Sequence, residues 1–131
     1  MAYNLLIVDD SRTMRTMIKR TIEMSDLEVG ELFEAGNGLE ALELLGREWV
    51  DVVLADINMP QMSGIELTER MQGSDELKGI PVIVISTESS ETRLQELQQK
   101  GIKGYVHKPF TPEQIRDAVT EVLGACHAGN E

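Results

Sequence analysis

Residues able to bind a cation or a phosphoryl group follow short apolar segments of this chain. They are Asp9 and Asp10 after residues 5–8, Asp56 after 52–55, Ser86 after 82–85 and Lys108 after 104–107. Carboxylates a few ångströms apart repel one another unless a cation compensates their charge. If these segments end side by side, the residues predict a site for Mg²⁺, which prefers oxygen ligands and often shares a phosphoryl group.

One of the carboxylates could itself be a nucleophile. Lys108 can hold a phosphoryl oxygen as a point charge, but the pattern contains no evident base that would activate water. An aspartate can instead attack phosphorus and form an aspartyl phosphate. Asp56 is the candidate, because its segment is expected to lie between the acid pair and the lysine.

Each of these residues taken alone has a more ordinary interpretation. A single aspartate after a strand is most often a turn or cap residue, and a lysine is usually solvated. The serine hydroxyl could simply satisfy a nearby backbone group. Their occurrence at the ends of successive apolar segments favours a functional site over these separate explanations.

The segments that position these residues predict an α/β fold. Residues 5–8, 52–55 and 82–85 are continuously apolar, which is typical of strands covered by helices on both faces. Residues 31–35 and 104–107 are weaker strand candidates. Strands that alternate five times with helices predict a (βα)5 doubly wound, five-stranded parallel sheet in a single domain. Ligands of such sheets bind at the carboxyl ends of the strands.

Capping signals mark the starts of three of the intervening helices. Asn37 and Ser63 are each followed three residues later by glutamate, a capping-box pattern. Thr111 is expected at an N-cap with Pro112 at the first helical position, where the missing N–H of proline costs nothing.

Composition limits the classes of function. A chain of 131 residues with a net charge of −11 fits one domain and argues against binding nucleic acid, which needs clustered basic residues. No apolar segment approaches the length of a membrane span and no leader pattern is visible, so we expect a cytoplasmic protein without membrane insertion. The single cysteine, Cys126, excludes an internal disulfide and is interpreted as incidental.

Four stretches of the sequence together resemble the receiver domain of two-component response regulators. They are LLIVDDSRTMR, LADINMPQMSGIEL, VIVISTES and GYVHKPFTPEQI. The resemblance covers essentially the whole chain and implies a flavodoxin-like fold. It places a receiver domain at residues 1–124 and a short tail at residues 125–131, with no output domain. The short length and the DDSRTMR stretch are most similar to stand-alone receivers of chemotaxis.

The resemblance also implies roles for individual residues. Asp56 would accept a phosphoryl group from a sensor histidine kinase. The Mg²⁺ ligands would be Asp10, Asp56 and the backbone carbonyl of Asn58, with Asp9 reaching the ion through water. The residues that bind the phosphoryl group or change conformation when it is bound would be Lys108, Ser86, Thr87 and Tyr105. Asn58 and Glu88 would tune dephosphorylation, and the Lys108–Pro109 peptide bond would be cis.

Phosphorylation would then change the surface formed by the helix expected at 91–100, the strand at 104–107 and the last helix. That surface would signal to a downstream protein, possible targets including the flagellar motor switch. The protein is thus interpreted as a monomeric phosphoacceptor that promotes its own phosphorylation and dephosphorylation, and not as an enzyme acting on other substrates.

Other functions remain open from the sequence alone. The main alternative is an aspartyl-phosphate phosphatase or phosphotransferase, although such enzymes usually have an acid two residues after the nucleophile, where this chain has Asn58. A single-domain phosphorelay intermediate outside chemotaxis is a second alternative. A flavodoxin-like cofactor binder would need a phosphate-binding loop where DDSRTMR stands. A phosphate-independent interaction module would not need Asp10, Asp56 and Lys108.

Overall fold

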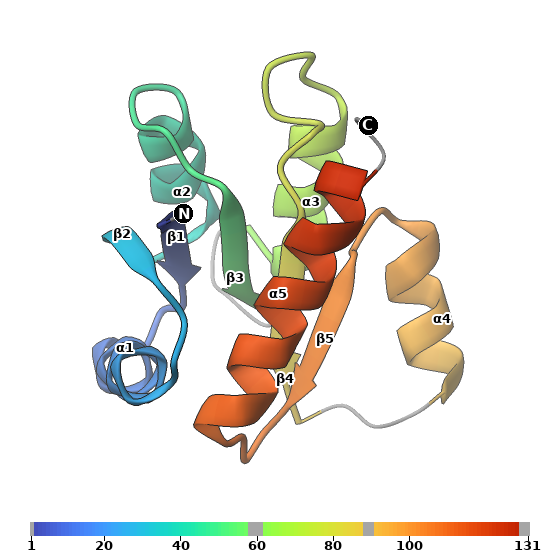
Figure 1. Cartoon of the computed structure of the whole chain (residues 1–131). Helices are drawn as coiled ribbons and strands as arrows, with labels where there is room; N and C mark the ends of the chain where they lie inside the picture. The colour runs from blue at the N-terminus through green and yellow to red at the C-terminus, as the bar shows by residue number, and fades with distance from the viewer. Residues whose placement is uncertain (1, 58–61, 88–90, 129–131) are drawn as a thin grey trace.

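The computed structural model describes residues 2–57, 62–87 and 91–128, and for residues 125–128 it describes the backbone alone. Strands and helices alternate along the chain (Figure 1). The strands are β1 (Tyr3–Val8), β2 (Val29–Ala35), β3 (Val52–Asp56), β4 (Val82–Ser86) and β5 (Gly104–His107). The helices are α1 (Arg12–Met24), α2 (Gly38–Leu45), α3 (Gly64–Gln72), α4 (Glu91–Gln99) and α5 (Pro112–Ala128).

The five strands form one parallel sheet in the order β2-β1-β3-β4-β5. This arrangement confirms the predicted (βα)5 fold. Every strand therefore ends at the same edge of the sheet, and the chain passes through helices on both faces to return to the opposite edge. The carboxyl ends of β1 and β3 are direct neighbours, because these two strands pair with each other.

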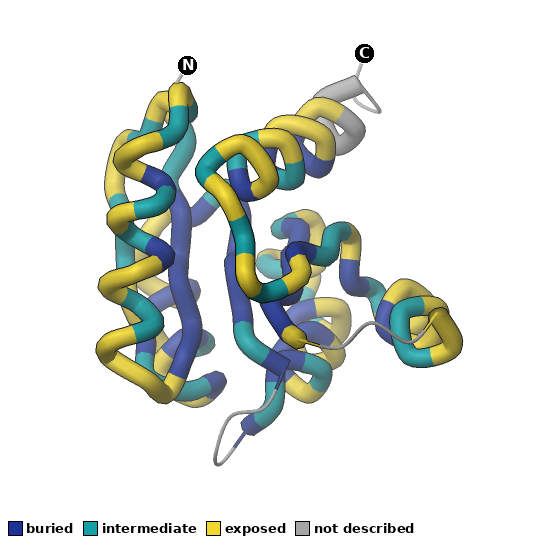
Figure 2. The backbone as a smooth tube through the Cα atoms, turned by 90° about the horizontal axis from the view of Figure 1, so that it is seen from below, coloured by how far each residue is buried: buried dark blue, intermediate teal, exposed yellow. Residues whose placement is uncertain are grey.

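Apolar side chains fill the space on both faces of the sheet. Alternate residues of β1 point in opposite directions, so Leu5 and Ile7 pack with α1 and α5, whereas Leu6 and Val8 pack with α2 and α3. Burial on both faces explains why the central strands are continuously apolar. Figure 2 shows the buried backbone in the strands and the exposed turns of the helices on the outside.

The predicted helix starts are confirmed by their hydrogen bonds. The side chain of Asn37 accepts the N–H of Glu40 at 2.9 Å. The hydroxyl oxygen of Ser63 accepts the N–H of Glu66 at 3.2 Å. At the start of α5, Thr111 and Gln114 form a reciprocal pair, in which each side chain accepts the backbone N–H of the other residue. These caps fix where α2, α3 and α5 begin, directly beside the carboxyl edge of the sheet.

Two helices differ from the rest in how they end or pack. Among the residues of α4, Leu97 is the buried one. It joins a small apolar cluster with Ile57, Val84 and Ile102. Helix α5 continues to Ala128, four residues past the end of the domain expected at residue 124. The division of the chain into a domain and a tail stays a prediction.

No helix in the described part of the chain has the length and apolar character of a membrane span.

Candidate functional site

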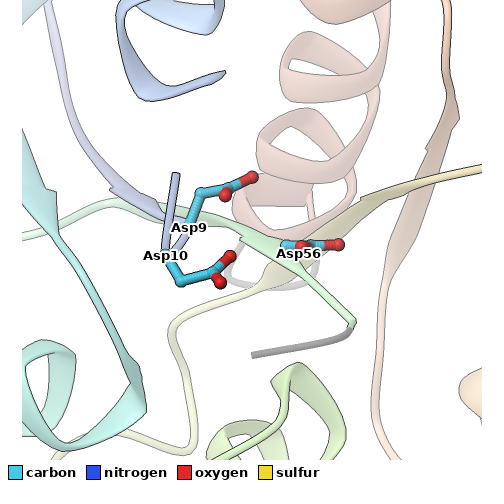
Figure 3. Close-up of side chains that lie close together, drawn as sticks. All are labelled: Asp9, Asp10 and Asp56. Carbon is cyan, nitrogen blue, oxygen red and sulfur yellow. The ribbon is translucent and has the colours of Figure 1, made fainter. Parts of the chain in front are cut away.

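Three aspartates meet at the carboxyl edge of the sheet. Val8 in β1 is in register with Ala55 in β3, so the next residues, Asp9 and Asp56, leave neighbouring strands at the same level. Asp10 follows in the loop toward α1. One carboxylate oxygen from each aspartate lies within 4.8 Å of those of the other two. Figure 3 shows the side chains of Asp9 and Asp10 beside that of Asp56.

Asp9 is the most buried of the three. Its side chain accepts the N–H of Ser11 at 2.8 Å, and the residue is 2% exposed. Burial raises the pKa of Asp9 above its usual value, an effect opposed by the hydrogen bond from Ser11. The charge of Asp56 raises the pKa further, the charge of Lys108 lowers it, and the charge of Asp10 raises it.

The other two aspartates are more accessible to water. Asp10 is exposed and Asp56 is half-buried. The cluster therefore has one carboxylate fixed in the interior and two at an open side. A set of carboxylate oxygens at this spacing suits a hard divalent cation such as Mg²⁺, which keeps part of its water shell. The residues thus fit the predicted metal, on the chemistry of their donor atoms.

Lys108 belongs to the same site through both its backbone and its charge. Its N–H donates to the carbonyl of Ser86 at 2.8 Å, which joins the ends of β4 and β5. Its ammonium is the cation that lowers the pKa of Asp9. The Lys108–Pro109 peptide bond is cis, the conformation that the resemblance implied.

The remaining predicted residues lie around this centre or outside the described part of the chain. Ser86 is the last residue of β4 and is buried, and Thr87 follows it at the surface. The hydroxyl of Tyr105 in β5 donates to the carbonyl of Ser86 at 3.3 Å. Asn58 and Glu88, predicted to tune dephosphorylation, lie outside the described residues.

Two residues near the site were not singled out from the sequence. Arg15 of α1 donates from Nη1 to the carbonyl oxygen of Asp9 at 2.6 Å. Gly64 begins α3 so close to β3 that an added Cβ would overlap the backbone carbonyl of Asp56. The stretches DDSRTMR and SGIE contained both residues, but spacing along the chain gave no sign of either contact.

Comparison with known proteins agrees with this geometry. The family described as response regulator receiver domain matches residues 5–120 of the chain. The chain belongs to this family.

Relatives of the receiver include chemotaxis proteins. It is 37% identical to the CheY homolog of Campylobacter jejuni over 121 residues, covering 92% of each chain. It is 38% identical to CheY1 of Helicobacter pylori over 121 residues, covering 92% of this chain and 96% of the relative. The structure of CheY4 of Vibrio cholerae matches with a TM-score of 0.82 and 31% identity, over 93% of this chain and 99% of that one. The protein is therefore a CheY-type receiver, consistent with phosphoacceptor signalling in chemotaxis.

Proposed function

We propose that this receiver accepts a phosphoryl group on Asp56 from a sensor histidine kinase, in a reaction that depends on Mg²⁺. The observation that supports this most directly is the approach of three carboxylates to within 4.8 Å of one another at a sheet edge that also carries Lys108. Such a concentration of negative charge is unfavourable by itself, and a divalent cation relieves it.

The proposed transfer forms one bond to phosphorus and breaks another. A carboxylate oxygen of Asp56 attacks the phosphorus, and the histidine nitrogen of the donor leaves with the electron pair of the broken P–N bond. Water later attacks the acyl phosphate, which releases inorganic phosphate and regenerates the aspartate. The same residues thus serve phosphorylation and dephosphorylation, and the protein acts as a signalling partner with a limited lifetime in its phosphorylated state.

Asp10, Asp56 and the backbone carbonyl of Asn58 would hold Mg²⁺, with Asp9 acting through water. When bound, the ion supplies neutralising charge for the phosphoryl oxygens. The ammonium of Lys108 would hold a phosphoryl oxygen, and the hydroxyls of Ser86 and Thr87 would lie next to the group.

We further propose that the signal leaves through α4, β5 and α5. Phosphorylation adds about −1.5 to −2 charges at one point. Recruitment of Ser86 to that charge would disturb the contact that its carbonyl makes with Tyr105. A groove of about 490 Å³ between α4 and α5 supports this route, because Tyr105, Lys103 and Gln98 line it together with residues of α5. The occupant would be a downstream chemotaxis target such as the flagellar motor switch.

In this proposal the protein is a cytoplasmic monomer that meets its donor and its target in turn.

Asn58 and Glu88 would flank the path of the attacking water. Glu88→Ala is therefore expected to change the rate of dephosphorylation more than the rate of phosphorylation. Equal changes in both rates would remove the basis for assigning Glu88 to this step.

The central test uses acetyl phosphate as a small donor. The protein is incubated with acetyl phosphate with and without Mg²⁺, and the intact mass is measured. We expect a single labile phosphoryl adduct that requires Mg²⁺ and is absent from Asp56→Asn. Asp75→Asn, the same change at an exposed loop position, should form the adduct normally. Repeated turnover of phosphomonoesters would instead support a phosphatase.

A further inference from the structure

Arg15 connects the helix after the acid pair to the backbone of the acid pair itself. Its Nη1 donates to the carbonyl oxygen of Asp9 at 2.6 Å, and its Nε donates to Oε1 of Glu34 at 3.1 Å. The arginine side chain is 17% exposed, so most of it is held within the fold. The planar guanidinium can make both contacts at once, which a lysine ammonium does less well.

The carbonyl that Arg15 contacts belongs to the peptide unit between Asp9 and Asp10. The other side of Asp9 is also fixed, because its N–H donates to the carbonyl of Ala35 at 3.1 Å. Its carboxylate accepts the N–H of Ser11. With these contacts in place, the direction of the Asp9–Asp10 peptide determines where both carboxylates lie relative to Asp56.

Glu34 anchors the arginine to the sheet. It is paired in register with Ile7 of β1, so it occupies a fixed position beside the strand that ends at Asp9. Lys19 also approaches it, with Nζ 3.7 Å from Oε2. The contacts therefore run from β2 through Glu34 and Arg15 to the loop after β1.

We propose that Arg15 is a positioning residue of the cation site, which orients the Asp9–Asp10 peptide so that both carboxylates face Asp56. This inference rests on the proposed Mg²⁺-dependent function. The role is geometric, since the arginine contacts the backbone carbonyl of the Asp9–Asp10 peptide. Residues that orient metal ligands typically change metal affinity about 10- to 100-fold when they are replaced.

The experiment measures binding of Mn²⁺, a probe that also prefers carboxylate and water ligands. Free Mn²⁺ is counted from its electron paramagnetic resonance signal during a titration of the full chain. We expect Arg15→Ala to weaken Mn²⁺ binding about tenfold or more. Arg15→Lys should recover part of the affinity, since one ammonium can still donate to the Asp9 carbonyl. Glu34→Gln should weaken binding less than Arg15→Ala, because its amide oxygen can still accept from Nε.

Arg12→Ala is the matched control for charge. Replacing either arginine with alanine removes one positive charge. Arg12 is exposed, begins the same helix and stands nearer to Asp10 in sequence than Arg15 does. It should leave Mn²⁺ affinity within about twofold of wild type. A loss as large as that of Arg15→Ala would show that charge alone matters and would overturn the proposal.

A thermal unfolding midpoint, measured in EDTA for every variant, separates positioning from general stability. If Arg15→Ala lowers this midpoint but retains wild-type Mn²⁺ affinity, Arg15 is merely structural and the proposal is wrong. Should Arg15→Ala not fold, the same comparison is made with Arg15→Lys and Glu34→Gln, and unchanged affinity in both would overturn it. Failure of the wild-type protein to bind Mn²⁺ would overturn the proposed function and this inference together.

Discussion

The hydroxyl of Tyr105 donates a hydrogen bond to the backbone carbonyl of Ser86 at 3.3 Å. The same carbonyl accepts the N–H of Lys108 at 2.8 Å. The carbonyl oxygen of Ser86 therefore accepts from two other residues proposed to act in the switch, at the junction of β4 and β5. Because that atom belongs to the backbone, this contact of Tyr105 does not need the serine hydroxyl.

This relationship gives a prediction for Ser86→Ala. We expect the unphosphorylated variant to keep the Tyr105 contact, whereas addition of beryllofluoride and Mg²⁺, which mimic the phosphoryl group, should move Tyr105 less than in wild type. Fluorine-labelled tyrosine measured by NMR reports this directly. The chain has two tyrosines. Tyr3 is the first residue of β1, at the end of that strand away from the cation site, so its signal serves as an internal reference. A full wild-type shift of Tyr105 in the variant would contradict the proposed role of the hydroxyl.

Gly64 should be intolerant of a methyl group. A Cβ there would overlap the carbonyl of Asp56, and this backbone cannot give way as a flexible side chain would. Gly64→Ala is expected to lower the free energy of unfolding by about 1–3 kcal/mol, as measured by urea denaturation. It should also weaken Mg²⁺-dependent phosphorylation, because relief of the overlap moves Asp56 or the start of α3.

Gly79→Ala is the control for this substitution. A Cβ at Gly79 meets no atom within 4 Å, so the added methyl group has space. Its main effect should be a restriction of the unfolded chain, and stability should stay unchanged or rise by up to about 1 kcal/mol. Equal destabilisation by the two alanine variants would rule out the contact with Asp56 as the cause.

The sequence was sufficient to predict most of the fold and the centre of the site. Continuous apolar runs identify β3 and β4 because both faces of these strands are buried. The edge strand β2 was predicted at 31–35 but extends over Val29–Ala35. It is partly exposed, so its apolar pattern is interrupted by glutamates. Once the strands are parallel, their polar end residues must meet at one edge, which is why Asp9, Asp10 and Asp56 could be grouped in advance.

Contacts of side chains with distant backbone atoms could not be predicted in this way. Arg15 reads as one more polar residue of an amphipathic helix, and its bond to the Asp9 carbonyl depends on how α1 leaves the loop. Helix α5 also continues past Gly124 to Ala128, although glycine itself disfavours a helix. Alanines follow this glycine, and their high helix propensity favours continuation.

Trp49 should be insensitive to the cation site. It is the single tryptophan of the chain and precedes β3, whose other end carries Asp56. The four steps of β3 from Val52 to Asp56 alone span about 13 Å at 3.3 Å each, and Trp49 stands three residues before Val52. We therefore expect its fluorescence to change little when Mg²⁺ is added at constant ionic strength. Strong quenching that disappears in Asp56→Asn would contradict the position of Trp49 relative to the site.

The raised pKa of Asp9 predicts how the metal-free protein responds to pH. Burial raises this pKa above the usual 3.8, so the folded state binds the proton more tightly than the unfolded state. The resulting stabilisation is fully present below the unfolded pKa and is lost as pH rises through the folded pKa. At neutral pH the buried carboxylate therefore destabilises the protein relative to a neutral side chain.

Asp9→Asn should accordingly have a higher unfolding midpoint than wild type at pH 7 in EDTA. The difference should shrink as pH falls through the folded pKa, because Asp9 then becomes neutral as well. Saturating Mg²⁺ should reverse the order, since wild type gains binding free energy that the variant largely lacks. Asp75→Asn, at an exposed position, controls for the loss of one negative charge. An unfolding midpoint for Asp9→Asn at or below that of wild type at pH 7 without metal would mean that burial of the charged Asp9 carboxylate does not destabilise the protein.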